Sequence, residues 1–136
     1  MSHKFTEFQL EWLKALRSGE YKQGKDYLCK DGQYCCLGVA CEIAPKFGVV
    51  FDEIIKRDGV VFFGDDHKEA PHKVYRQLGL KGSLGELYDS FASTTVAVKL
   101  PTGETGAALS EMNDGNMTFA AIADYIEKNP TQVFKQ

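Results

Sequence analysis

Four cysteines lie close together in this chain, within the stretch YLCKDGQYCCLGVACEIA of residues 27–44. They are Cys29, Cys35, Cys36 and Cys41. A thiolate can bind a metal ion or act as a nucleophile, whereas a protonated cysteine behaves as a small apolar side chain. The stretch is therefore a candidate metal site, a candidate catalytic site or a part of the core.

The spacing of these cysteines does not favour a metal site. Structural zinc sites commonly use two Cys-x₂₋₄-Cys pairs held apart by a longer loop, and this stretch has different spacings. Asp31-Gly32 predicts a two-residue turn, which directs Cys35 to the opposite face from Cys29 and Cys36. The plausible ligands from outside the stretch are His67 and His72. We therefore predict neither a bound metal nor a cofactor.

A nucleophilic cysteine is the alternative that the chemistry favours more. Cys35 or Cys36 would stand at the start of a helix, where unpaired amides and the helix dipole stabilise a thiolate. A cysteine-dependent hydrolase also needs a histidine, oriented by a carboxylate or an amide. The groups that could complete such a site are His67, His72, Asp65 and Asp66.

We favour the third interpretation, in which the cysteines belong to the core. Free cysteine is among the most frequently buried residue types. The segment Leu37–Ala44 is almost entirely apolar and ends at Pro45, which predicts a short buried helix. Gly38 would allow this helix to approach a neighbouring backbone closely.

Local signals predict the other helices. Thr6 and Gln9 form a capping box, and apolar residues then recur at helical spacing, so we expect a helix over Glu7–Ser18. Pro71 suits the first turn of a helix that ends at Gly79. Residues 107–130 predict a helical pair that breaks between Asn113 and Asn116, with Thr118 capping the second helix. No third helix is expected after this pair, which argues against a DNA-binding helix-turn-helix.

Two hairpins and one further strand complete the expected elements. Asp31-Gly32 and Asp58-Gly59 each lie between β-prone segments, as type I′ hairpin turns do. The run Thr94–Leu100, followed by the turn PTGETG, predicts a strand at an edge of the sheet. We therefore expect a single α+β domain over residues 1–136. Its small, mainly antiparallel sheet from two hairpins would pack with the N-terminal helix, the cysteine-containing helix and the C-terminal helical pair.

Composition narrows the classes of function. The formal net charge of −3 provides no overall positive field, so we expect no nucleic-acid partner. No segment approaches the roughly 20 apolar residues that a bilayer crossing needs, and the first residues do not resemble a signal peptide. We therefore expect a cytoplasmic protein without a membrane partner, in which the thiols stay reduced rather than forming disulfides.

Aromatic residues make up 12% of the chain, and several lie outside the helical patterns. Exposed aromatic side chains are frequent anchors of binding surfaces. The candidates for such a surface are Phe62, Phe63, Tyr88 and Phe91.

Two segments resemble a group of small uncharacterised proteins that tailed phages and prophages encode. They are LKALRSGEYKQGKDYLCKDGQYCCLGVACEIAP (13–45) and LSEMNDGNMTFAAIADYIEKNP (109–130). The resemblance carries no activity, cofactor or catalytic residue, but it implies a phage or prophage accessory protein in a bacterial host cell. By analogy with other small phage proteins, we expect a non-enzymatic binding protein. It would inhibit a host protein, for example in host defence, or sequester a small nucleotide-like signal. The sequence is also compatible with a homo-oligomer.

Overall fold

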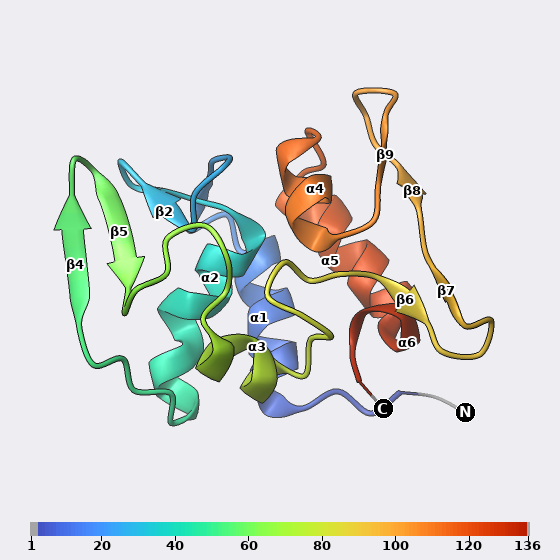
Figure 1. Cartoon of the computed structure of the whole chain (residues 1–136), viewed down its shortest axis with the longest axis horizontal. Helices are drawn as coiled ribbons and strands as arrows, with labels where there is room; N and C mark the ends of the chain where they lie inside the picture. The colour runs from blue at the N-terminus through green and yellow to red at the C-terminus, as the bar shows by residue number, and fades with distance from the viewer. Residues whose placement is uncertain (1–2, 136) are drawn as a thin grey trace.

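The computed structural model describes residues 3–135 and begins with the expected helix (Figure 1). Helix α1 spans Glu7–Arg17. Its capping box is formed, because the Gln9 amide donates to Thr6 Oγ1 while Gln9 Oε1 accepts from the Thr6 amide. The apolar face of α1 is buried, and Trp12 Nε1 donates a hydrogen bond of 2.9 Å to the carbonyl of Cys36.

Both predicted hairpins are confirmed, and together they form most of one sheet. Its strands are β1 (Lys22–Gln23), β2 (Cys29–Lys30), β3 (Gln33–Tyr34), β4 (Ile54–Arg57) and β5 (Val60–Phe63), in the order β1-β3-β2-β5-β4. All neighbouring pairs are antiparallel except β1 with β3. Asp31-Gly32 and Asp58-Gly59 have positive φ at both positions, as a type I′ turn requires.

The cysteine-containing helix lies at the centre of the molecule, between the five-stranded sheet and the other helices (Figure 1). This helix, α2, spans Cys36–Ile43, and the 3-10 turn η1 (Ala44–Phe47) follows it. A Cβ added to Gly38 would lie 1.7 Å from the carbonyl oxygen of Leu28. Glycine therefore permits the close approach of α2 to the strand side of the core.

The remaining helices agree with the predicted positions, with one addition. They are α3 (His72–Leu78), α4 (Leu109–Asp114), α5 (Phe119–Lys128) and α6 (Pro130–Val133). The expectation that no third helix follows the C-terminal pair is wrong, since α6 adds one turn there. Proline at its first position suits a helix start, and the Phe134 amide bonds back to the carbonyl of Pro130.

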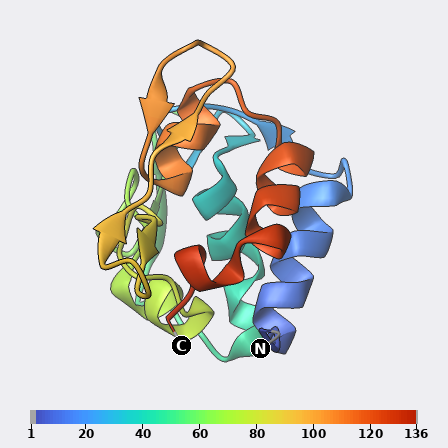
Figure 2. The same cartoon turned by 90° about the vertical axis from the view of Figure 1, so that its right-hand side faces the viewer.

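The prediction of one edge strand over Thr94–Leu100 is also wrong. The run contributes to two separate ribbons, one beside α6 and the other beside α4, and both lie away from the five-stranded sheet (Figures 1 and 2). Their strands are β6 (Tyr88–Asp89) with β7 (Thr94–Thr95), and β8 (Val98–Lys99) with β9 (Thr105–Gly106). Each half of the run pairs with its nearest neighbour along the chain, so neither half extends the main sheet.

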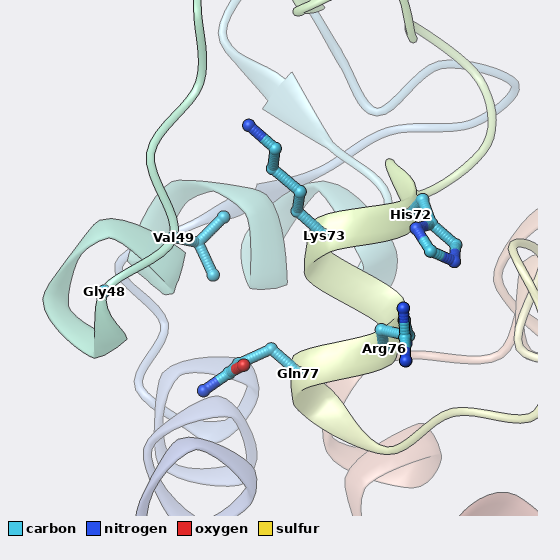
Figure 3. A pocket seen from close by; sticks show the side chains of 6 residues that line it. All are labelled: Gly48, Val49, His72, Lys73, Arg76 and Gln77. Carbon is cyan, nitrogen blue, oxygen red and sulfur yellow. The ribbon is translucent and has the colours of Figure 1, made fainter.

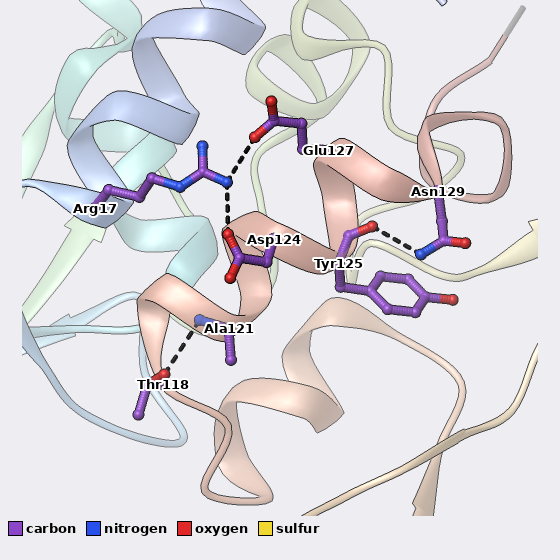
Figure 4. A network of polar contacts seen from close by, with 7 residues as sticks. All are labelled: Arg17, Thr118, Ala121, Asp124, Tyr125, Glu127 and Asn129. Carbon is purple, nitrogen blue, oxygen red and sulfur yellow. Dashed lines mark hydrogen bonds and ion pairs between the residues drawn. The ribbon is translucent and has the colours of Figure 1, made fainter.

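The α+β class is confirmed, and the buried apolar side chains form one cluster that includes all six helices and the main sheet. Helices α1 and α5 are also joined at the surface. Arg17 pairs with Asp124 at 2.8 Å and with Glu127 at 2.6 Å (Figure 4). In the same view Thr118 Oγ1 accepts from the Ala121 amide, which is the predicted N-cap of α5.

Candidate functional site

All four cysteines are buried, with exposed fractions of 0–5%. Burial raises the pKa of each thiol, and for Cys35 the value rises to about 11, although the Gly38 amide donates to its sulfur at 3.3 Å. Cys35 is the N-cap of α2, so the predicted position at a helix start is correct. Desolvation nevertheless outweighs the helix terminus, and the thiols are protonated at neutral pH.

The histidines of the hydrolase alternative lie elsewhere. The His67 ring contacts the rings of Phe62 and Tyr27, and the His72 ring contacts Tyr75. Across residues 3–135, no hydrogen bond or ring contact joins a histidine to a cysteine. A Cys–His pair is therefore not assembled in this structure.

The two carboxylates considered with these histidines lie in the loop after β5. Burial raises the pKa of Asp66, and the nearby carboxylates of Glu69 and Asp65 raise it further. This loop lines a pocket beside α3, where the acids meet His72 and not a cysteine.

The four candidate aromatic residues are divided between two regions. Phe62 and Phe63 are neighbours on β5 and point to opposite faces of the sheet, and Phe63 is buried. Tyr88 and Phe91 lie on the β6–β7 ribbon, where Phe91 is 89% exposed. They therefore do not form one surface.

A pocket of about 420 Å³ lies along α3 (Figure 3). Its lining residues are Gly48, Val49, His72, Lys73, Arg76 and Gln77. Figure 3 shows Lys73 and Gln77 on the side of α3 that faces the Gly48–Val49 backbone, while His72 and Arg76 occupy the neighbouring ridge of the helix. This placement follows from helix geometry, since residues four apart share a face.

A second pocket, of about 230 Å³, shares His72 and Lys73 with the first. Its other lining residues are Phe51, Asp52, Phe63, Gly64, Asp65, Asp66 and Pro71. We call the two pockets together the α3 groove. One end of this groove is basic, and the other end combines the Phe51 and Phe63 rings, 5.4 Å apart, with three carboxylates.

Lys73 is fixed where the two pockets meet. Its Nζ donates to the Val50 carbonyl at 3.1 Å and lies 4.0 Å from Asp52. Arg76 forms no ion pair with any residue in the described part of the chain, and no carboxylate lines the basic pocket. The guanidinium of Arg76 is therefore available to an anionic ligand.

The sequence indicates some residues of the α3 groove but not its basic end. His72, Asp65, Asp66 and Phe63 were candidates for other roles, whereas Arg76 was not a candidate. The residue spacing could have identified Arg76, because Arg76 lies four residues after His72 on a predicted helix and therefore shares its face. The opposite wall at Gly48–Val49 comes from a segment more than twenty residues earlier in the chain, which no local pattern connects to α3.

Two other properties concern the described residues 3–135 as a whole. No three His, Cys, Asp or Glu side chains of these residues gather closely enough to hold a metal ion. None of the helices has the length and apolar character needed to cross a bilayer.

Comparison with known proteins identifies a family. The model of the family described as "Domain of unknown function (DUF8296)" matches residues 5–130. No curated protein and no solved structure matches the chain. Because the family match covers nearly the whole sequence, this chain belongs to the DUF8296 family.

Proposed function

We propose that this chain is a phage-type accessory protein that acts by binding, and that its ligand is a small phosphorylated, nucleotide-like molecule held in the α3 groove. One observation carries the proposal: a pocket of about 420 Å³ presents three basic side chains and no carboxylate, and it adjoins an aromatic pocket. Small-molecule sites typically have volumes of about 300–1,000 Å³.

The basic end would bind the phosphate. Arg76 offers a planar guanidinium that can donate two parallel hydrogen bonds to a phosphate group. Lys73 adds a positive charge whose position the Val50 carbonyl already fixes. Part of the ordering entropy of this side chain is therefore lost before the ligand arrives, which favours binding.

The other end would bind the ring system of the ligand. Phe51 is partly exposed and packs against the buried Phe63, so it can offer an aromatic surface to a planar ring. Asp65 and Asp66 can accept hydrogen bonds from amino or hydroxyl groups. The groove thus combines an anion site with acceptors and an aromatic surface, as nucleotide recognition requires.

Binding without catalysis fits the chemistry of the site better than hydrolysis does. The buried thiols have raised pKa values, and no histidine contacts them within residues 3–135. The phage resemblance supplies the context, in which a small cytoplasmic protein sequesters a nucleotide signal in the bacterial host. The resemblance supports this proposal only by analogy.

Inhibition of a host protein is a second candidate function, and Phe91 favours it. This side chain is 89% exposed in a turn that Asp89 orders, because Asp89 Oδ1 accepts hydrogen bonds from the amides of Phe91 and Ala92. An exposed aromatic side chain on an ordered turn is a suitable anchor for a protein interface.

Isothermal titration calorimetry with inorganic phosphate, a nucleoside and nucleoside mono-, di- and triphosphates tests the proposed ligand class. We expect the phosphorylated nucleosides to bind more tightly than phosphate or the nucleoside alone. Arg76→Gln should weaken binding by at least about tenfold, since hydrogen bonds to charged groups contribute about 1.5–3 kcal/mol. Lys14→Gln, at an exposed position on α1 outside the groove, is the control and should bind as the wild type does. Absence of binding, or equal binding by the Arg76 variant, would refute the proposal.

A further inference from the structure

A row of three aromatic rings lies on the main sheet, apart from the α3 groove. The His67 ring centroid is 4.6 Å from that of Phe62 and 6.1 Å from that of Tyr27, and both ring pairs are tilted by about 30°. We call these three residues the ring row. His67 is held there because its carbonyl accepts a hydrogen bond from the Leu28 amide at 2.8 Å.

Three cations lie over the ring row. The Nζ atoms of Lys30 and Lys68 are 4.9 and 5.1 Å from the Tyr27 ring centroid, and the guanidinium carbon of Arg57 is 5.7 Å from that of Phe62. None of these cations forms an ion pair with another described residue. The rings hold them by cation–π attraction while their hydrogen-bond donors stay available.

Strand register extends the basic character across the sheet. Lys22 pairs with Gln33, Gln33 with Lys30, Lys30 with Val60, and Val60 with Arg57. Paired residues project from the same side of a sheet, so these side chains form one line across all five strands. This side faces solvent, because Lys22, Lys30 and Arg57 are exposed.

Two carboxylates, those of Asp31 and Asp58, lie at one end of this face, and the Asp66 carboxylate lies near His67. Asp31 and Asp58 belong to the two hairpin turns, and the pairing of Lys30 with Val60 places both turns at the same end of the sheet. The ring row lies toward the other end, since Phe62 is two residues beyond Val60 on β5. A phosphate backbone could therefore pass over the rings without meeting these two acids.

We propose that this face of the main sheet binds single-stranded nucleic acid. Proteins that bind single strands combine aromatic rings, on which bases stack, with basic side chains along the backbone. The ring row supplies the first component, and Lys30, Lys68 and Arg57 supply the second. The net charge of −3 argues only against a non-specific field around the whole protein, whereas this surface is local.

Fluorescence anisotropy with a short labelled oligothymidine, at several salt concentrations, tests the proposal. We expect binding at low salt, with affinity falling as salt increases. Phe62→Leu should weaken binding about tenfold through loss of base stacking. Phe91→Leu removes an equally aromatic but distant ring and should have no effect. Lys30→Gln should reduce the slope of log affinity against log salt by about 0.7, and Lys14→Gln on α1 should not change it.

Three results would overturn the inference: no binding at low salt, equal binding by wild type and the Phe62 variant, or equally strong binding of duplex DNA. Lys30→Gln changes only an exposed side chain, so it keeps the test valid if the Phe62 variant does not fold. Arg76→Gln distinguishes this surface from the α3 groove. It should leave oligothymidine binding unchanged even where it abolishes nucleotide binding.

Discussion

Helices α2 and α3 are both short, yet their side chains have opposite roles. Three of the four cysteines belong to helix α2, counting its N-cap Cys35. All three are buried. Helix α3 carries ordinary basic and amide residues, but His72, Lys73 and Arg76 line the basic pocket of the α3 groove. The comparison shows that exposure and grouping, rather than residue type, decide which element can bind a ligand.

Electrostatics reinforce this difference. The α2 thiols have raised pKa values because burial penalises the thiolate, so they are poor nucleophiles and poor metal ligands at neutral pH. The charged groups of Lys73 and Arg76 on α3 are exposed to solvent, so an anion can displace the water that hydrates them. Substitutions in the two helices test whether α2 is purely structural and whether α3 is dispensable for stability.

The largest effect is expected from Gly38→Ala in α2. The new Cβ would meet the Leu28 carbonyl at 1.7 Å, so the helix or the strand must move, at a cost of about 3 kcal/mol or more. Urea denaturation monitored by circular dichroism measures this loss. Gly82→Ala is the matched control, because its Cβ meets only the flexible Glu86 side chain and should have a much smaller effect. Equal effects of the two substitutions would show that α2 is not tightly packed.

Asn113→Ala should have the next largest effect, because this buried side chain joins the start of α2 to α4. Asn113 Oδ1 accepts from the Cys36 amide at 3.2 Å and from Gln23 at 2.9 Å, and its Nδ2 donates to the Gly24 carbonyl. Leaving these groups without partners should lower the free energy of unfolding by about 2 kcal/mol. A loss below about 0.5 kcal/mol in the same denaturation experiment would contradict the structural role of this network.

Alkaline pH should destabilise the protein through the α2 thiols. The pKa of Cys35 is about 11 in the folded protein, above the value of an exposed thiol, so the unfolded state releases the proton first. The contribution of each protonated thiol to the free energy of unfolding is therefore fully present below the ordinary thiol pKa. It decreases as pH rises toward 11, by up to about 1.4 kcal/mol per pH unit for each thiol. Denaturation of the wild type and of Cys35→Ala across this range measures the effect. A thiolate that is favoured in the folded state would give the opposite trend.

The smallest effect on stability is expected from Arg76→Gln in α3. This side chain forms no ion pair within residues 3–135, so the free energy of unfolding should change by less than about 0.5 kcal/mol. Removing Arg17, whose ion pairs are exposed at the surface, should lower it by about 0.5 kcal/mol (Figure 4). A large destabilisation by Arg76→Gln would mean that α3 is a structural element like α2.

Much of the fold could be predicted from the sequence, because the relevant signals are local. The Thr6–Gln9 capping box and the two Asp-Gly turns depend on neighbouring residues alone, and all of them are formed. The run Thr94–Leu100 also has strand character, but its pattern does not identify a pairing partner. The structure pairs its two halves with β6 and β9 instead of the main sheet.

The candidate sites were less predictable, since they depend on segments that are distant in the sequence. The α3 groove needs the Gly48–Asp52 backbone beside α3, and the ring row needs Tyr27 beside His67. Neither of these contacts produces a periodic pattern or a characteristic residue spacing in the sequence. The burial of the cysteines, in contrast, could be predicted from the apolar character of their own segment.

Chemical-shift mapping by two-dimensional NMR of the labelled protein, titrated with nucleoside phosphates, tests whether the α3 groove binds the ligand while α2 stays structural. We expect shift changes for the amides of Gly48–Asp52 and His72–Gln77, and none for those of Cys35–Cys41 beyond small secondary effects. The absence of any change at α3, or changes concentrated on the cysteine-containing helix, would contradict this expectation.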